Sequence, residues 1–481
     1  MAKKPTKAPP KPVRKPKPQP KAKPAAPAKK KPVRPLAPAP AKPAPAKPVV
    51  ARPSTDLGFP IFQEPVFGEV NLADFKVPAD SAEYNNSQVK ALLTTQVTPF
   101  NPMRGKPGDL FTLASALGPT GDKTVQAITS QKQVVFHAVG DTGASSSRSY
   151  AGEIQASDAM VADFHASQAA DRPAFYFNLG DTVYNFGESQ YYYEQFYDAY
   201  RNYPAPIFSI PGNHDCFVLP DLAKGAETPL QTFARNFCAP TPVITKEAGS
   251  LHRTAMTQPG VYFTLDAPFV RIIGLFSNAL EDPGVISSEG GVWKTITDVQ
   301  LTYLTAQLQQ IKSSQYAGAV IIAVHHPPFS YTTAQSAAKS HSSSTAMLRD
   351  IDTICKAQGV YPHAFLSGHA HNYQRYTRKV TFNGHAYQVP FLVCGSGGHN
   401  VNPLVMAKGG DPGKNIDVSY LEKNPAVTSG GVTLVNYNDK NFGYLRVTVT
   451  DQQLTMAFVP VYPTGGSPDS VTVNLATHTI V

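Results

Sequence analysis

The fold of this sequence is decided by one stretch, residues 134–143, which reads Val134-Val135-Phe136-His137-Ala138-Val139-Gly140-Asp141-Thr142-Gly143. Its first six residues form an almost unbroken apolar run, and its last four are polar or glycine. A near-continuous apolar run is typical of a strand that is covered on both faces of its sheet. We therefore expect a buried strand that ends at a polar loop containing Asp141.

The same pattern recurs along the chain. Six further apolar runs, each followed at once by polar residues, are predicted as buried strands: Ala174–Leu179, Pro206–Ile210, Val270–Phe276, Ala319–Val324, Ala364–Ser367 and Phe391–Cys394. The clearest helix is expected at Asp298–Ile311, whose leucines share one face and whose start, Thr297-Asp298-Val299-Gln300, has the form of a capping box. A second helix is expected at Ala156–Ala169. The segments Gly443–Val449 and Leu454–Val459 are predicted to form a hairpin, so the whole pattern indicates an α/β sandwich.

Five polar motifs follow five of these strands. They are Gly140-Asp141-Thr142-Gly143, Gly180-Asp181-Thr182-Val183-Tyr184, Gly212-Asn213-His214-Asp215, His325-His326-Pro327-Pro328 and Gly368-His369-Ala370-His371. Ligand sites in open α/β sheets lie beyond the carboxyl ends of the strands, so the placement indicates one shared site. Carboxylate, imidazole, amide and phenol groups are borderline-to-hard ligands that suit Fe, Zn or Mn.

In this order, the five motifs resemble those of the calcineurin-like metallophosphoesterases, over roughly residues 131–460. The resemblance implies a four-layer αββα sandwich of two mixed β-sheets. One departure points to the purple acid phosphatase branch. Most family members carry D-x-H in the first motif, where this chain has Gly143, and purple acid phosphatases replace that histidine with a tyrosine at the position of Tyr184.

The resemblance also implies a role for each motif residue. A first metal ion would be held by Asp141, Asp181, Tyr184 and His371, and a second by Asp181, Asn213, His325 and His369. Fe(III) is expected beside the tyrosine, and Fe, Zn or Mn at the other position. His214 and His341 would act near the leaving group. A solvated loop position is an equally good interpretation of His341.

Three aromatic residues have competing interpretations. Tyr184 precedes an aromatic-rich stretch and could be a core residue. His326 is expected to face the substrate or a loop, because in the resembling families the histidine two before the proline binds metal, which selects His325. The glycines before His399 suggest close backbone approach at the rim of the site, but the imidazole itself is not assigned a role.

The first 55 residues differ from the rest. They hold 16 Lys/Arg, 17 of the 45 prolines and no Asp or Glu, whereas the remaining 426 residues carry a net charge of −7. We predict a disordered basic tail (1–55), a loop-rich lead-in (56–130) and a phosphoesterase domain (131–481). The tail is either a solubility tail or a non-specific contact for nucleic acid or another polyanion.

No recognisable signal peptide or membrane span is present, so a cytoplasmic protein is expected. The four cysteines are expected to be free thiols, although a Cys216–Cys238 bridge stays open.

The predicted reaction is hydrolysis of phosphate esters by a metal-bound hydroxide, and monoesters are the expected substrates, as in acid phosphatases. Two alternatives stay open. One is a phosphodiesterase or nuclease of the same family, because one fold hosts many reactions. The other is a non-catalytic polyanion-binding protein that uses the basic tail.

Overall fold

The computed structural model describes residues 57–63, 91–92, 95–216, 227–228, 230–331, 341–404 and 418–481. The predicted basic tail, and with it the polyanion contact, lies outside the described residues. All described residues belong to one compact unit, Ser54–Val481. Within its described part, no helix is both long enough and apolar enough to cross a membrane.

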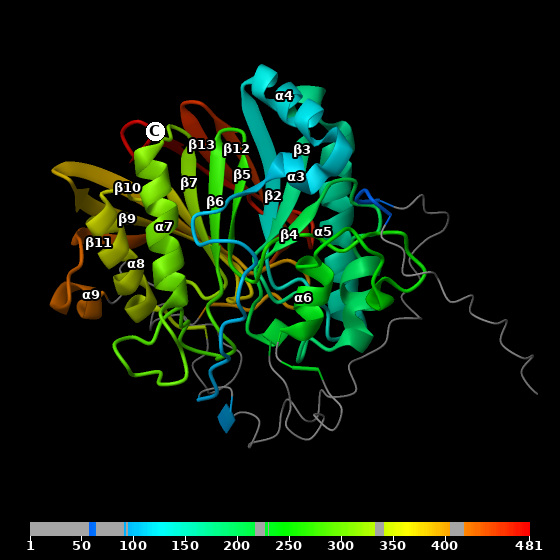
Figure 1. Ribbon diagram of the computed structural model, residues 1–481, viewed down its shortest axis with the longest axis horizontal. Coiled ribbons are helices and arrows are strands. Elements are labelled where there is room, and N and C mark those ends of the chain that lie inside the picture. The colour runs from blue at the N-terminus through cyan, green and yellow to red at the C-terminus, as the bar shows by residue number, and fades with distance from the viewer. Residues whose placement is uncertain are drawn as a thin grey trace, which may run out of the picture. The chain divides into compact units, whose positions relative to one another are not determined.

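Two mixed β-sheets form the centre of this unit (Figure 1). The first has eight strands in the order β1-β5-β6-β7-β8-β10-β9-β11. Strands β6, β7, β8 and β10 run parallel to one another. The bounds are β1 Phe111–Thr112, β5 Phe263–Ala267, β6 Val270–Leu275, β7 Ala319–Val324, β8 Ala364–Ser367, β9 Tyr373–Phe382, β10 His385–Cys394 and β11 Thr428–Asn438.

The second sheet has seven strands in the order β15-β14-β13-β12-β2-β3-β4. Strands β2, β3 and β4 are parallel, and β12 joins them antiparallel to β2. The bounds are β2 Gln133–Val139, β3 Pro173–Asn178, β4 Ile207–Ser209, β12 Phe442–Thr450, β13 Gln453–Tyr462, β14 Asp469–Asn474 and β15 Thr479–Ile480.

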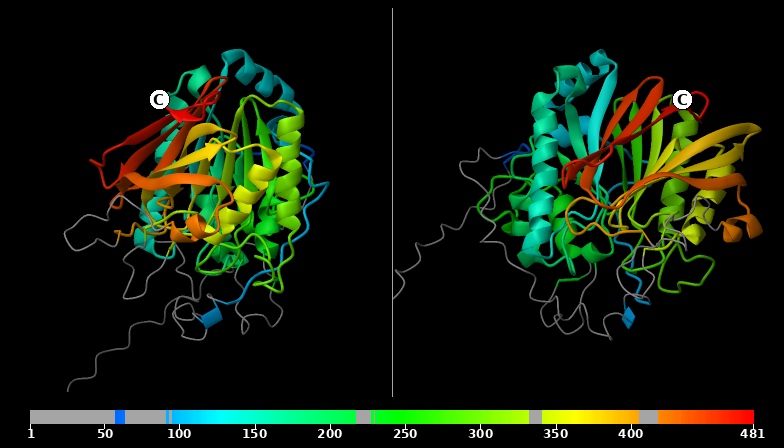
Figure 2. Two further views of the ribbon diagram at one scale, coloured as in Figure 1. Left: turned by 90° about the vertical axis from the view of Figure 1, so that its left-hand side faces the viewer. Right: turned by 180° about the vertical axis from the view of Figure 1, so that it is seen from behind.

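Helices cover the outer faces of both sheets (Figure 2). Helix α5 (Ser147–Ala166) packs on β12 and β13, while α7 (Val299–Ser313) packs on β6 and beside α8 (Thr345–Gln358). Smaller helices are α3 (Leu113–Leu117), α4 (Gly121–Gln131), α6 (Gln231–Phe237) and α9 (Ser419–Lys423). The resulting four layers confirm the predicted αββα sandwich.

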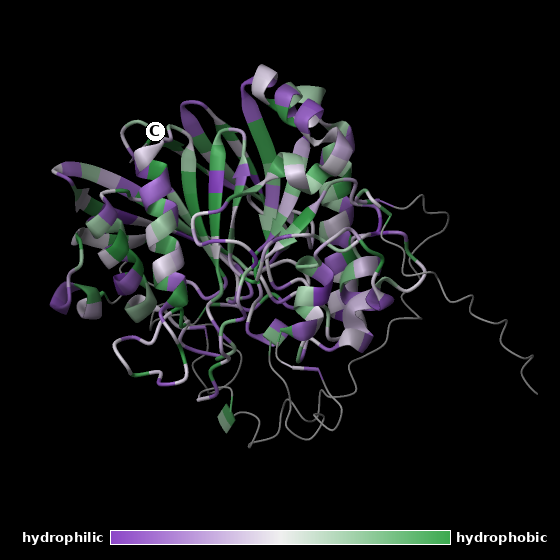
Figure 3. Cartoon of the chain, in the orientation of Figure 1, coloured by the Kyte–Doolittle hydropathy of each residue, from purple (hydrophilic) through white to green (hydrophobic). Residues whose placement is uncertain are grey.

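The core lies between the sheets, whose strands are mainly apolar in Figure 3. Aromatic side chains join the two sheets: Phe263 of β5 stacks on Phe177 of β3 with ring centroids 5.9 Å apart, and Tyr373 of β9 stacks on Phe458 of β13 at 4.3 Å. Buried aromatic pairs add about 0.5–1.5 kcal/mol each to their area burial. These contacts fix one sheet against the other and hold their strand ends together.

All seven predicted strands and the hairpin are present, but two details of the predicted helices are wrong. Helix α5 begins nine residues before Ala156, at Ser147. Helix α7 forms as predicted without the capping box. Instead, the Gln300 amide accepts a hydrogen bond from Phe276 N and donates one to Phe276 O, at 2.9 and 2.8 Å, so it ties the helix to the end of β6.

Candidate metal centre

The seven predicted metal-binding residues all lie just beyond the carboxyl ends of parallel strands. Asp141 follows β2, Asp181 and Tyr184 follow β3, and Asn213 follows β4 in one sheet. In the other sheet, His325 follows β7, and His369 and His371 follow β8. Because both sheets present these ends to the same place, the structure brings all seven side chains together.

The backbone of three of these residues is unusual. Asp141, Asp181 and His369 have φ angles of 57°, 55° and 69°, in the left-handed region that non-glycine residues rarely adopt. Such conformations cost about 1–3 kcal/mol each and cluster at functional sites. The turn after β4 leaves no room for a side chain at Gly212, where a Cβ would lie 2.0 Å from Asp181 Oδ1.

The first group of donors gathers around the hydroxyl of Tyr184. Its oxygen lies 2.9 Å from Asp181 Oδ2, 3.1 Å from Asp141 Oδ1 and 3.3 Å from His371 Nε2. One hydroxyl has one proton and can donate to only one of these three neighbours. The remaining lone pairs therefore face each other in a buried space, which is the arrangement that a cation would stabilise.

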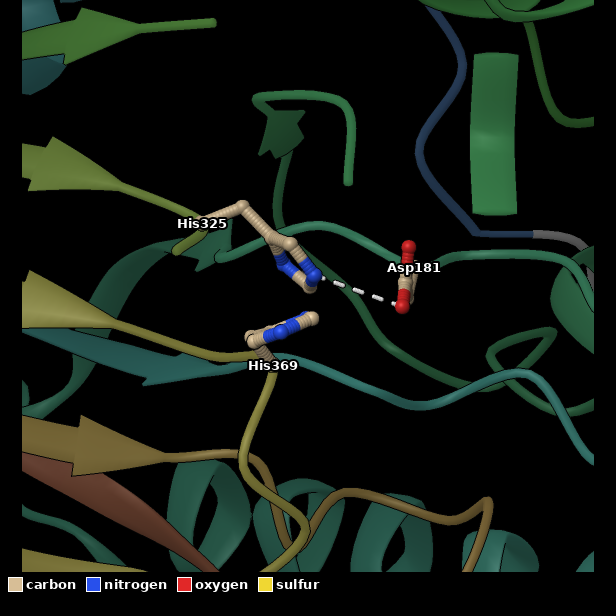
Figure 4. Close-up of side chains that lie close together, drawn as sticks. All are labelled: Asp181, His325 and His369. Carbon is tan, nitrogen blue, oxygen red and sulfur yellow. Dashed lines mark ion pairs between the residues drawn. The ribbon is translucent and has the colours of Figure 1, made fainter. Parts of the chain in front are cut away.

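The second group gathers around the amide oxygen of Asn213. It lies 3.1 Å from His325 Nε2 and 3.1 Å from His369 Nδ1. His325 Nε2 is also 3.3 Å from Asp181 Oδ2 (Figure 4). Asp181, His325 and His369 each offer one ligand atom within 4.8 Å of the others.

One carboxylate oxygen, Asp181 Oδ2, belongs to both groups. It contacts the Tyr184 hydroxyl on one side and His325 Nε2 on the other. The second oxygen, Oδ1, is fixed by the backbone N–H of His214 at 2.8 Å. Two cations a few ångströms apart repel each other unless a shared anion lies between them, and Asp181 is placed to be that anion.

Tautomers and charges fit the same conclusion. His325 Nδ1 lies 2.8 Å from Leu179 O, which only accepts, so Nδ1 carries the proton and Nε2 points its lone pair into the site. Although burial lowers it, the charges of Asp181 and Asp141 raise the pKa of His325 to about 9. In the metal-free protein Nε2 is therefore protonated beside Asp181, and it offers its lone pair to a metal ion only once that proton has left.

Burial and the two nearby carboxylates raise the pKa of the Tyr184 hydroxyl well above its usual value. Burial and neighbouring imidazoles lower the pKa of His369 and His371 well below the usual range, so both rings are neutral and able to bind metal. The donors present therefore fit two metal ions. One set of four consists of Tyr184 and its three neighbours, and the other of Asn213, His325, His369 and Asp181, so that Asp181 belongs to both sets.

Comparison with known proteins agrees with this geometry. Residues 134–373 match the family model of the calcineurin-like phosphoesterases. The chain belongs to this family. The family implies a dinuclear metal centre, and donor groups that could hold metal are present.

Solved structures resemble parts of the chain at low identity. The purple acid phosphatase PPD1 from yellow lupin (Lupinus luteus) seeds has a TM-score of 0.44 and 14% identity, over 71% of this chain and 54% of that one. GAP50, the anchor in the inner membrane complex of Plasmodium, gives 0.41 and 12%, over 70% and 88%. PhoD gives 0.40 and 15%, over 71% and 70%. The phosphoesterase chain spans about half the length of the lupin enzyme. No curated protein matches the sequence.

A buried glutamine holds the tyrosine of the phosphoesterase site in place. Gln195 accepts a hydrogen bond from Tyr184 N at 2.8 Å and donates one to Tyr184 O at 2.7 Å. A Cβ at Gly143 would lie only 2.7 Å from Gln195 Oε1 and 2.5 Å from Thr182 O. Gly143, where most family members carry a histidine, therefore leaves room for the Gln195 side chain that is hydrogen-bonded to the Tyr184 backbone.

His399 takes part in the site, although its imidazole was not predicted to. Its ring stacks on Tyr184 with centroids 3.6 Å apart and planes at 10°, and its Nδ1 lies 3.1 Å from Gly143 O. His326, in contrast, holds a loop: Nδ1 contacts Ser277 Oγ and Nε2 contacts Leu280 O, both at 2.7 Å. This agrees with the prediction that His326 is no ligand.

Both histidines predicted near the leaving group lie at the site. His214 Nδ1 donates to Asn185 O at 2.7 Å, and its ring lies 4.2 Å from that of Tyr184. The His341 ring is 4.8 Å from His369 and 4.9 Å from His371. Burial lowers the pKa of His341 to about 3, so His341 is a buried neutral group and no solvated loop residue.

Two acidic residues at the site were not predicted. Glu281 and Asp282 follow β6, the strand between β5 and β7, and their carboxylates face His341 and His369. The run Val270–Phe276 was predicted as a strand, so the same strand-end argument would have found them. The Cys216–Cys238 disulfide that the sequence left open does not form. Both cysteines are free and buried, as are Cys355 and Cys394.

Proposed function

We propose that this phosphoesterase hydrolyses phosphate monoesters at a dinuclear centre whose two ligand sets share Asp181. The observation that carries the proposal is the position of Asp181 Oδ2, 2.9 Å from the Tyr184 hydroxyl and 3.3 Å from His325 Nε2. When bound, two metal ions would acidify a water molecule and neutralise charge on the phosphoryl oxygens.

The ligand types support a different metal at each position. A phenolate is a hard, anionic donor that favours a trivalent ion, so Fe(III) is proposed beside Tyr184. The Asn213, His325 and His369 set is neutral apart from the shared carboxylate, which suits a divalent Fe, Zn or Mn. The tyrosine in place of a histidine at position 143 also supports a purple acid phosphatase-like enzyme.

The remaining roles fall to residues of the chain that hold or move protons. Because His214 Nδ1–H is committed to Asn185 O, His214 Nε2 is the atom that can deliver a proton to the leaving oxygen. Asp215 accepts hydrogen bonds from Thr182 N and Gly212 N, both at 2.9 Å, and so joins the two loops that carry Asp181 and Asn213. His341 packs beside His369 and His371 as a third neutral imidazole.

The test compares a nitrophenyl phosphate monoester with the matching bis-ester, using metal-replete protein. We expect the monoester to be hydrolysed faster, and Asp181→Asn to lower the rate by a factor on the order of 10²–10³ or more, as for other losses of transition-state stabilisation. The exposed Asp451→Asn is the matched control and should leave the rate unchanged. A faster bis-ester reaction would replace the proposal with a phosphodiesterase, and unaltered hydrolysis by Asp181→Asn would contradict the site.

A further inference from the structure

Two partly exposed carboxylates lie next to the buried imidazoles of the site. The Glu281 and Asp282 side chains keep 22% and 21% of their surface exposed, whereas the imidazoles they face, His341 and His369, keep 3% and 2%. The two carboxylates are therefore the more accessible partners in these pairs, and a ligand bound at the site from solvent can contact them.

Their contacts place them within reach of a bound ester. Glu281 Oε2 lies 3.5 Å from Asn213 Nδ2, and Glu281 Oε1 lies 4.0 Å from His341 Nε2. Asp282 Oδ1 lies 3.8 Å from His369 Nε2, a buried nitrogen that makes no hydrogen bond within the described residues. Asp282 is held in this position by Ser342 N, which donates to its Oδ1 at 2.9 Å.

No basic side chain of the described residues balances this charge. The ion-pair partners of Glu281 and Asp282 in the described part of the chain are histidines, and none is a Lys or Arg. This is unusual for a site that receives an anionic phosphate, because a negative rim repels any further negative charge on the substrate. The phosphoryl group itself would be held by the metal ions, so the rim acts on the part of the ester that leaves.

We propose that Glu281 and Asp282 select phosphate esters whose leaving group carries a positive charge, as in aminoalkyl phosphates. The proposal rests on the phosphoesterase function proposed above and specifies its substrate class. An ammonium group two carbons from the ester oxygen would lie beside the two carboxylates, whereas a carboxylate at the same place would be repelled. One charge pair at about 5 Å near a protein surface is strong enough to change affinity about tenfold or more.

Binding tests this directly with probes that cannot be hydrolysed. The two probes are 3-aminopropylphosphonate and butylphosphonate, which have the same length and differ in one terminal charge. Calorimetry on metal-replete protein should give about tenfold tighter binding of the amine. The double variant Glu281→Gln with Asp282→Asn should bind both probes alike, while the exposed Glu422→Gln on α9 should keep the wild-type ratio.

Turnover supplies the second arm. We expect kcat/KM to fall in the order 2-aminoethyl phosphate, propyl phosphate, phosphoglycolate, whose leaving groups are positive, neutral and negative. Equal binding of the two phosphonates, in a protein that hydrolyses these esters at similar rates, overturns the charge selection and leaves the phosphoesterase function intact. A protein that binds neither phosphonate and hydrolyses none of the esters overturns both. The wild-type comparison decides the matter even if the double variant does not fold.

Discussion

Replacing Gln195 by methionine should destabilise the domain and loosen the tyrosine at the metal centre. The glutamine amide makes two hydrogen bonds to the backbone of Tyr184, at 2.8 and 2.7 Å, in a fully buried position. Methionine is similar in length, so little volume is lost. Its side chain cannot form these hydrogen bonds, however, so the backbone N–H and C=O of Tyr184 would stay buried without a hydrogen-bond partner. Each unsatisfied group costs about 1–3 kcal/mol, so the two groups give a loss of about 2–6 kcal/mol in the free energy of unfolding.

Urea unfolding of chelator-treated protein measures this loss without any contribution from bound metal. The matched control is Gln190→Met, because Gln190 is exposed five residues earlier and should change the free energy of unfolding by less than about 0.5 kcal/mol. The metal-replete variant should also bind less metal beside Tyr184. If the free energy of unfolding of Gln195→Met lies within about 0.5 kcal/mol of the wild-type value, the two hydrogen bonds from Gln195 to Tyr184 do not stabilise the domain. That result would contradict the role given to Gln195.

Three other changes have expected outcomes. Tyr184→Phe should abolish visible tyrosinate absorption in Fe(III)-loaded protein and remove one metal ion per chain by elemental analysis; an unchanged spectrum would exclude Tyr184 as a ligand. Asp352→Asn should cost about 3–5 kcal/mol in urea unfolding, because it leaves the buried Arg378 charge unpaired where Asp352 now lies at 2.8 Å; a loss below 1 kcal/mol would contradict this. Burial lowers the pKa of His363 to about 4, so stability should fall as pH drops from 6.5 to 4, by about 1.4 kcal/mol per unit from this residue. His363→Gln should remove that part of the slope, since the unfolded chain then gains one proton fewer.

The sequence predicted the strands that carry the site because each is buried on both faces and reads as a continuous apolar run. Strand β9 (Tyr373–Phe382) was missed for the opposite reason. Beyond Arg375 its residues alternate between buried and more accessible positions, and the buried positions include the polar Arg378, so no continuous apolar run marks the strand. The helix α4 (Gly121–Gln131) was missed within the predicted loop-rich lead-in, because its face toward the core buries only Gly121 and Ile128. A criterion based on continuous apolar runs predicts elements that are buried on all sides, and it misses elements that keep one accessible face.

Similar limits apply to the site. Residues that directly follow a strand, such as Asp141 and His325, could be placed at the site from the strand-end motifs, and the family resemblance implied their roles. Gln195 could not, because it lies 11 residues after Tyr184 in an aromatic-rich segment, and only the folded backbone turns its amide toward that tyrosine. His399 likewise contacts Tyr184 because the chain turns after β10. The two stacked rings are far apart in the sequence. Such contacts depend on tertiary packing, which local sequence patterns do not encode.

The central claim is that one chain holds two metal ions on ligand sets joined by Asp181. Anomalous X-ray scattering from crystals of metal-replete protein tests it most directly. Two peaks are expected, one beside the Tyr184 hydroxyl and one beside Asn213 Oδ1, each within bonding distance of Asp181. A single peak, or peaks away from these atoms, would contradict the dinuclear centre and the function built on it.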